Sequence, residues 1–185
     1  MTETREDTDL TRAFMGRADA VGSRLVGLHA AYLAGRLTLD EFIDAAALLI
    51  GAAQAQMYGL ADASLAAWVS AETQTAVPAL GIVAPDNGPG LREGLSALLA
   101  VVDPEDPAAR VARMGRAETA GAFQDGYSEA MRERRDVVGG YVRVLNASAC
   151  ELCVWLWRGG YVWPAGKSFH RHPGCGCHPG PVLRG

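Results

Sequence analysis

All four cysteines of this 185-residue chain lie within its last 36 residues. The first two form a Cys150-x-x-Cys153 pair, and the other two belong to the run Phe169-His-Arg-His-Pro-Gly-Cys-Gly-Cys-His178. The only histidine outside that run is His29. Zinc takes four ligands in a tetrahedral arrangement, and a Cys-x-x-Cys step lets one tight turn supply two of them. The spacing therefore predicts a metal site in the C-terminal part of the chain.

Several sets of four ligands satisfy this spacing, and they differ in the second pair. His172 and Cys175 stand three residues apart, so one turn could aim both inward. Cys175 and Cys177 could do the same and would give an all-thiolate site. The candidate ligands are therefore Cys150, Cys153, His172, Cys175 and Cys177, with His170 and His178 as reserves.

The alternative for these thiols is a set of disulfides, which needs an oxidising compartment. The acidic residues 1–9 show no secretory-signal pattern, so we expect synthesis in a reducing cytosol. The single residue between Cys175 and Cys177 also resists a disulfide within that pair. We therefore expect a structural zinc ion (Zn2+), whose binding contributes about 10–16 kcal/mol in peptide systems. Such an ion could hold together a segment too small to fold alone.

The composition of the cluster argues against catalysis. A catalytic zinc keeps an open position and usually has a carboxylate base nearby, whereas here thiolates dominate and Glu151 is the only acidic residue after Asp136. The histidine-rich run 169–172 is similar to metal-finger nucleases, but these need an asparagine-bearing helix after the cluster. The residues after His178 include two prolines and two glycines, which cannot form one. We expect no enzymatic activity.

Charge is divided unevenly along the chain. The net charge is −4, yet from Arg132 onward eight Lys/Arg face three Asp/Glu, which leaves −9 for residues 1–131. The basic part suits an acidic surface or nucleic acid, but an excess of this size does not establish DNA binding. The longest apolar run, residues 45–53, is far too short to span a bilayer, so we expect no membrane contact.

Apolar periodicity and capping signals predict a helical body. A 4-3-4-3-4 seam ends at Tyr32, with His29 beside it as an ordinary packing residue. Thr38-x-x-Glu41 is a capping box that opens a second helix, antiparallel to the first. That helix is apolar on nearly every side, so it is either central in its own bundle or pressed against another protein; we favour the partner. The seam residues are Phe14, Ala18, Val21, Leu25, Leu28 and Tyr32.

Later segments read as shorter helices and then strands. Helices are predicted from Ser64 to about Ala76 and from Leu91 to Val102, on either side of a loop at residues 85–90. Asp106 and Pro107 are an N-cap and a proline at the first helical position, and they open a long helix that closes at residues 132–135.

After Gly139-Gly140, a strand is expected at residues 141–145. A hairpin of residues 154–157 and 161–163 should follow around Gly159-Gly160. The fold class predicted is mainly α with a small β-hairpin zinc-binding C-terminal module (α+β). Its regions are an N-terminal helical region (1–84), a linker with the long amphipathic helix (85–140) and the zinc-stapled tail (141–185).

The aromatic residues of this tail have two interpretations. We favour hydrophobic cover for the hairpin; the other is an exposed patch that stacks bases or docks a protein. Its aromatic members would be Trp155, Trp157, Tyr161 and Trp163, and its cations Arg158, Lys167 and Arg171.

The order Cys150-x-x-Cys153, glycine turn, then His172-Pro-Gly-Cys175-x-Cys177 resembles the C-terminal signature of the phage Mu F-like head morphogenesis (minor capsid) family. The helix 112–120, rich in Arg, Glu, Thr and Ala, also resembles the helix that precedes this signature, and the likeness covers about residues 111–182. Gly159-Gly160 departs from the Asp-Gly turn common there, which a hairpin tolerates.

This resemblance implies a non-enzymatic component of the phage virion, made in the bacterial cytoplasm. It would be present in few copies, bound to the portal protein or the major capsid protein, and would act in head assembly or DNA delivery. The functional positions it implies are Cys150, Cys153, His172, Cys175 and Cys177. The alternative function is a zinc-dependent nucleic-acid-binding adaptor, whose phosphate contacts would be Arg132, Arg134, Arg135, Arg143, Arg158, Lys167 and Arg171.

Overall fold

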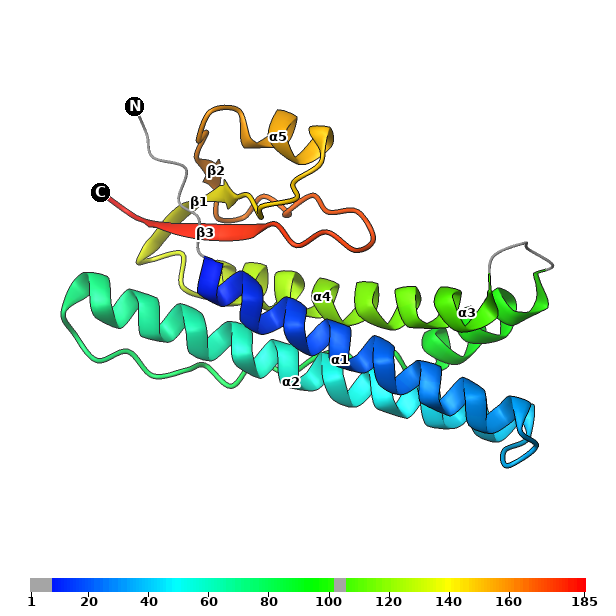
Figure 1. The fold of residues 1–185 in the computed structure, drawn as a ribbon. Helices are drawn as coiled ribbons and strands as arrows, with labels where there is room; N and C mark the ends of the chain where they lie inside the picture. The colour runs from blue at the N-terminus through cyan, green and yellow to red at the C-terminus, as the bar shows by residue number, and fades with distance from the viewer. Residues whose placement is uncertain (1–7, 102–105) are drawn as a thin grey trace.

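The computed structural model describes residues 8–101 and 106–185 as a helical layer, a small sheet and one further short helix (Figure 1). The sheet lies above the long helices, and the short helix lies on the other side of the sheet. In chain order the elements are α1 (Thr8–Leu33), α2 (Leu39–Thr73), α3 (Gly88–Ala100), α4 (Pro107–Glu133), β1 (Val138–Val144), α5 (Glu151–Trp157), β2 (Trp163–Pro164) and β3 (His178–Leu183).

Helices α1, α2 and α4 form the bundle, and the predicted seam of α1 faces its interior. Phe14 and Leu25 are fully buried, and the ring of Phe14 stacks on Phe123 of α4 with centroids 4.5 Å apart. His29 is buried edge-on against Phe42, as expected for a packing histidine. On α4, Gly115 allows this close approach, because a Cβ there would lie 2.1 Å from Leu25 Cδ1.

Helix α2 starts at the predicted capping box. The Thr38 N–H donates to Glu41 Oε2 at 2.8 Å, and the Glu41 N–H donates back to Thr38 Oγ1 at 3.2 Å. The helix then continues unbroken to Thr73, so the separate helix predicted from Ser64 is wrong. Buried residues recur at helical spacing on both sides of Ser64, so the helix does not break there. They are Met57, Tyr58, Ala61, Leu65 and Val69. Fourteen residues of α2 are buried within this chain, whereas Leu48 is 76% exposed, and the partner contact expected for this helix stays a prediction.

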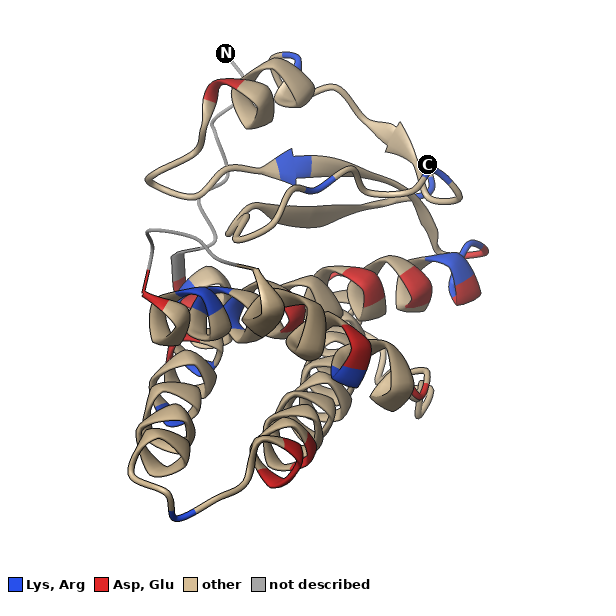
Figure 2. Ribbon diagram, turned by 90° about the vertical axis from the view of Figure 1, so that its right-hand side faces the viewer, with Lys and Arg blue, Asp and Glu red and all other residues tan. Residues whose placement is uncertain are grey.

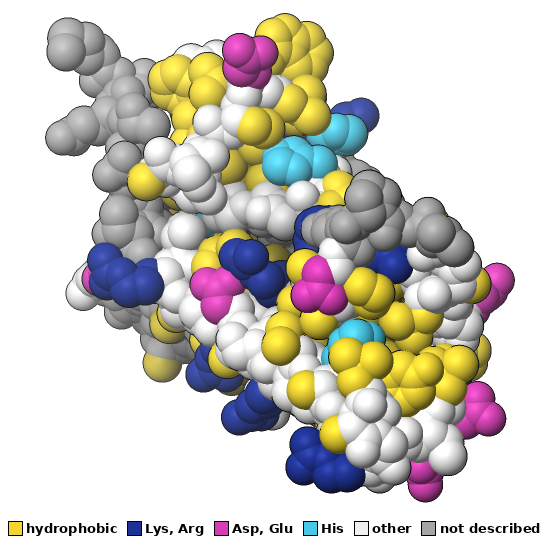
Figure 3. Space-filling model, turned by 45° about the vertical axis from the view of Figure 1, so that its right-hand side comes forward, with side chains coloured by type: hydrophobic (Ala, Val, Ile, Leu, Met, Phe, Trp, Pro, Cys, Tyr) yellow, Lys and Arg dark blue, Asp and Glu magenta, His cyan; other side chains and the backbone are white. Residues whose placement is uncertain are grey.

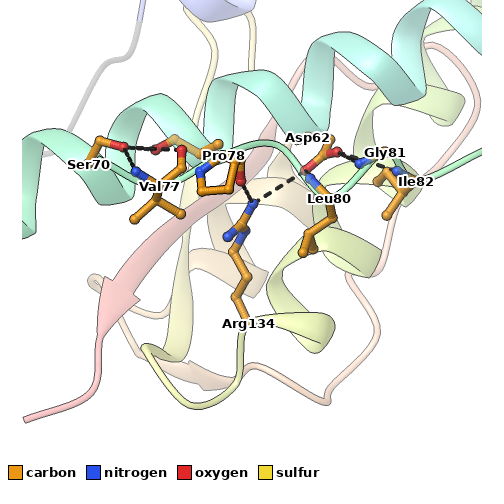
Figure 4. A network of polar contacts seen from close by, with 9 residues as sticks. Asp62, Ser70, Val77, Pro78, Leu80, Gly81, Ile82 and Arg134 are labelled. Carbon is orange, nitrogen blue, oxygen red and sulfur yellow. Dashed lines mark hydrogen bonds and ion pairs between the residues drawn. The ribbon is translucent and has the colours of Figure 1, made fainter. Parts of the chain in front are cut away.

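An extended segment, residues 75–87, runs back along α2 and is fixed by a buried carboxylate (Figure 4). Asp62 accepts the backbone N–H groups of Leu80 at 3.0 Å and of Gly81 at 2.7 Å. Arg134, just past α4, forms an ion pair with Asp62 at 3.7 Å and donates to the Pro78 carbonyl. One acidic side chain thereby joins α2, the extended segment and the end of α4.

The cap of α4 agrees with the sequence prediction. Asp106 accepts the Ala108 N–H at 3.0 Å, and Pro107 is the first helical residue. Helix α3 begins at Gly88, inside the predicted loop, and its predicted end at Val102 lies outside the described residues.

The three strands form an antiparallel sheet in the order β2-β1-β3. β1 begins at Val138, so Gly139 and Gly140 belong to the strand rather than preceding it. Gly140 is required there, because a Cβ would lie 2.4 Å from the Trp163 carbonyl oxygen. β3 was not predicted, and it packs between β1 and α4.

The hairpin predicted around Gly159-Gly160 is wrong in its first half. Residues 151–157 form helix α5, and β2 pairs with β1 instead of with residues 154–157. Short apolar runs do not separate helix from strand by period alone. The fold class itself is confirmed: the chain is mainly helical, with a small antiparallel sheet and a C-terminal Cys/His cluster that could bind a metal.

One hydrophobic core extends from the bundle into the C-terminal part. It contains Phe14 and Phe123 together with Tyr141 of β1 and three of the cysteines, Cys153, Cys175 and Cys177. Within residues 8–101 and 106–185, no helix combines the length and apolarity needed to cross a bilayer.

Candidate metal centre

The first pair of predicted ligands stands at the start of α5. Cys150 is the N-cap residue, with extended backbone (φ −75°, ψ 166°), and its carbonyl accepts the Val154 N–H at 3.0 Å. Cys153 lies in the first turn of the helix and is buried, whereas Cys150 is exposed. A helix start with this spacing puts both sulfurs on one side of the turn.

The second pair flanks a tight turn. The Cys175 N–H donates to the His172 carbonyl at 3.1 Å, across Pro173 and Gly174. Gly174 has φ +76°, so the turn has proline at its second position and left-handed glycine at its third, as in type II turns. The local sequence thus brings His172 and Cys175 to the two ends of one turn.

These two turns meet. His172 Nε2 lies 3.2 Å from Cys150 Sγ and 3.6 Å from Cys153 Sγ, and Cys153 Sγ lies 3.4 Å from Cys175 Sγ. The donors form two groups that share Cys153, each with its ligand atoms within 4.8 Å of one another. The first group is Cys150, Cys153 and His172, and the second is Cys153, Cys175 and Cys177. The prediction of a cluster that could hold a metal ion is confirmed, and the four cysteines are free of disulfides.

Hydrogen bonds from other elements hold the second turn in place. Gln124 of α4, itself buried, donates from Nε2 to the Cys175 carbonyl at 2.8 Å and to the Cys177 carbonyl at 2.6 Å. The Cys177 thiol contacts Asn146 Oδ1 at 3.8 Å. The cluster is therefore anchored to the bundle.

A buried cation lies against the cluster. Arg143 of β1 is 4% exposed, donates to Cys153 Sγ at 3.6 Å and donates to the His170 carbonyl. Its guanidinium lies 4.0 Å from the centre of the Phe169 ring. Within the part of the chain described, no carboxylate lies within ion-pair distance of Arg143. A buried guanidinium needs an anion, and thiolates are the nearest groups that could supply one.

The thiols without metal share hydrogen bonds that set their protonation. The side chain of Cys177 donates to Cys175, which lowers the pKa of Cys175 and raises that of Cys177. Burial raises the pKa of Cys153 to about 12, and a backbone hydrogen bond from Cys153 lowers the pKa of Cys150. The cluster thus favours one internal thiolate, and a bound metal would displace the remaining thiol protons.

The reserve histidines lie outside both donor groups. His178 is 1% exposed in the core, where its ring meets Phe14 edge-on and its Nδ1 lies 3.3 Å from Thr11 Oγ1. His170 is exposed, and its backbone carbonyl accepts a hydrogen bond from Arg143.

Several predicted phosphate contacts are already engaged. Arg134 and Arg143 are buried, and Arg171 forms a bidentate pair with Asp125 at 3.2 and 2.6 Å. Arg158 lies over two indole rings, 5.2 Å from Trp155 and 5.1 Å from Trp163. In the ribbon of Figure 2 the acidic residues (red) lie mostly on the helices, and the sheet and loops above carry mainly basic residues (blue).

Comparisons of the chain with protein-family models, with curated proteins and with solved structures found no match. Sequence reasoning identified all five donors of the cluster but missed the residues that support it, Gln124, Arg143 and Asn146. Nothing in their local sequence marks them, because each reaches the cluster from outside the two cysteine turns: Arg143 lies 10 residues from Cys153, Asn146 lies 31 from Cys177, and Gln124 lies 51 from Cys175.

Proposed function

We propose that the protein is a non-enzymatic minor capsid or head-morphogenesis protein of a tailed phage, with its C-terminal part held by a structural zinc ion. The observation that carries the zinc is the buried guanidinium of Arg143 beside Cys153. A zinc ion with three thiolates and one imidazole carries a net negative charge, which this cation would offset.

The preferred ligands are the four donors connected by short contacts: Cys150, His172, Cys153 and Cys175. Cys177 is the fifth donor, and its Sγ also lies 3.8 Å from Asn146 Oδ1. When bound, zinc would join the start of α5 to the turn at residues 172–175, which are otherwise connected by a long irregular segment. Its role there is cross-linking, since a set of four protein ligands leaves no position open for water.

The setting in a phage head rests on the tail signature described above and on the shape of the molecule. The zinc-bound segment lies on a rigid helical bundle, which suits a docking component of the portal or inner capsid within the virion. The unequal charge of the two parts fits contact with two different surfaces.

The zinc-dependent nucleic-acid adaptor is the second candidate. The cations that remain exposed in its predicted contact set, Arg158 and Lys167 among them, favour it. The burial of Arg134 and Arg143 and the pairing of Arg171 count against a continuous phosphate-binding face.

Two measurements test these proposals. Protein purified anaerobically should contain one zinc ion per chain, and replacing Cys153 with serine should weaken zinc binding strongly; a metal-free wild type would refute the structural zinc. The full chain should co-purify with the portal ring of the same phage and show no salt-dependent affinity for DNA. Tight, salt-sensitive DNA binding without portal association would favour the adaptor instead.

A further inference from the structure

A groove of about 340 Å³ opens between α5, the β1–β2 edge of the sheet and the loop at residues 165–170. Its lining includes Tyr141 of β1, Trp155 of α5 and Trp163 of β2. Its complete lining is Tyr141, Arg143, Leu152, Trp155, Leu156, Arg158, Trp163, Lys167, Ser168 and His170. The lining therefore combines aromatic and aliphatic side chains with three Lys/Arg residues and one histidine, and it has no carboxylate.

The segment that contains α5 and the residues just after it is unusually apolar for an exposed surface. Trp155 is 63% exposed, and four further large apolar residues of the same segment are exposed beside it in the sequence: Leu152, Val154, Tyr161 and Val162. Hydrophobic side chains gather at the upper end of the molecule, where α5 lies (Figure 3). Exposed apolar surface concentrated in this way marks a contact site.

The cations of the groove are available to a ligand. Among the described residues, neither Arg158 nor Lys167 has a carboxylate partner. Residues 138–185 contain five Lys/Arg and a single acidic residue, Glu151, which does not line the groove. The field inside the groove therefore favours an anionic occupant.

The position of Arg158 is fixed by the backbone. It caps α5 in the left-handed region, with φ 49°, where residues other than glycine are uncommon. From there its guanidinium lies over both Trp155 and Trp163. A cation held between two indole rings is already positioned for a carboxylate, so little side-chain entropy is lost on binding.

We infer that this groove docks an acidic segment of a partner protein, with an aromatic or aliphatic side chain seated against Trp155 and Leu156. Carboxylates of the segment pair with Arg158 and Lys167, while the seated side chain covers the exposed indole. Single-stranded nucleic acid fits less well, because Arg158 already covers one face of each indole on which a base would stack.

This inference rests on the proposed zinc site, because Cys150 and Cys153 begin the helix that forms one wall of the groove. The test uses the zinc-loaded full chain and a short fluorescein-labelled peptide of Asp, Glu, Trp and Leu, followed by fluorescence anisotropy. Dissociation constants of about 10–100 μM are expected at low salt, weakening as salt rises. Peptides with Lys in place of Asp and Glu, or with Ser in place of Trp and Leu, should bind at least about tenfold more weakly.

Two variants locate the contact. Arg158→Glu and Trp155→Ala should each weaken binding at least about tenfold. The matched controls, Arg24→Glu on α1 and Leu48→Ala on α2, change exposed residues of the bundle and should bind as the wild type does.

The inference is overturned if the peptide does not bind at about 1 mM, or if Arg158→Glu binds it unchanged. An oligothymidylate that binds with higher affinity than the peptide would also overturn it, in favour of nucleic acid. Self-association of the chain in light scattering that the peptide reverses would point to a second copy as the occupant and count against it as well. Zinc content measured on the same samples separates the two proposals: loss of peptide binding with zinc present refutes the groove alone.

Discussion

Gln124 and Cys177 are joined by a buried hydrogen bond of 2.6 Å, from the side-chain amide of α4 to the carbonyl next to β3. The same amide donates to the Cys175 carbonyl at 2.8 Å. One side chain of the helical bundle therefore fixes the backbone of the cysteine turn, so the position of the metal ligands depends on α4 as well as on the metal.

Replacing Gln124 with leucine should uncouple this turn from the bundle. Two buried carbonyls would lose their donor, at a cost of about 1–3 kcal/mol for each unsatisfied group. We expect a lower melting temperature and faster proteolysis of residues 145–185, with zinc still bound. Gln56→Leu, an exposed change on α2, is the control and should leave both unchanged. Equal proteolysis of the two variants would show that the amide does not anchor the turn.

The Asp62–Arg134 pair should contribute more to stability than any surface pair. Asp62→Asn leaves a buried guanidinium without its carboxylate and weakens the hold on residues 80–82, which should cost about 3–5 kcal/mol. The control is Asp44→Asn, which breaks an exposed pair with Arg92 of 2.7 Å and should cost under about 1 kcal/mol. Chemical denaturation measures both, and similar losses for the two variants would contradict the burial argument.

The caps of α2 and α4 show which parts of this fold are determined by local sequence. Thr38 and Glu41 lie three residues apart, and Asp106 precedes Pro107 directly, so both helix starts could be predicted from a few letters. The ligand spacing is local in the same sense, since each pair lies within one turn.

The supporting residues could not be predicted, because their partners lie far along the chain. Gln124 reaches a carbonyl 51 residues away, and Asp62 holds N–H groups 18 to 20 residues away. The strand predicted at residues 154–157, which form part of α5, was wrong for a different reason. Its alternating Trp155-Leu156-Trp157 fits a strand, but Cys150 caps a helix whose first turn carries Cys153.

Single cysteine replacements can show which of the two donor groups holds the zinc ion. Cys153 belongs to both donor groups, so Cys153→Ser should reduce zinc affinity most, by at least about a hundredfold. Cys177→Ser removes the donor that faces Asn146 and should leave one zinc per chain. Zinc stoichiometry after dialysis against a competing chelator distinguishes them. Loss of zinc from Cys177→Ser with retention in Cys150→Ser would assign the site to the second group.

The capping box of α2 should add a pH dependence in the acid range. A hydrogen bond from the Thr38 backbone lowers the pKa of Glu41 below its ordinary value of 4.5. Because the folded pKa is below the unfolded one, the stabilisation is present above about pH 4.5 and is lost as the pH falls through the folded pKa. Glu41→Ala should lower the melting temperature at pH 7 and much less at pH 3, whereas Glu93→Ala on α3 should have little effect at either. An unchanged difference at both pH values would contradict the charged cap.

Replacing Arg143 should have different effects on the metal-free and on the zinc-bound protein. Without metal, burial raises the pKa of Cys153 to about 12 and keeps this thiol protonated, so Arg143 offsets no charge on the sulfur that it contacts, and Arg143→Met should leave stability unchanged or increase it. With zinc bound, Cys153 is a thiolate and the cation offsets the charge of the site, so the same variant should lose about 10–100-fold in zinc affinity. The comparison needs thermal unfolding in chelator and a zinc competition titration on the same preparation. A variant that is strongly destabilised in chelator, with unchanged zinc affinity, would mean that Arg143 serves the His170 carbonyl and the Phe169 ring rather than the metal.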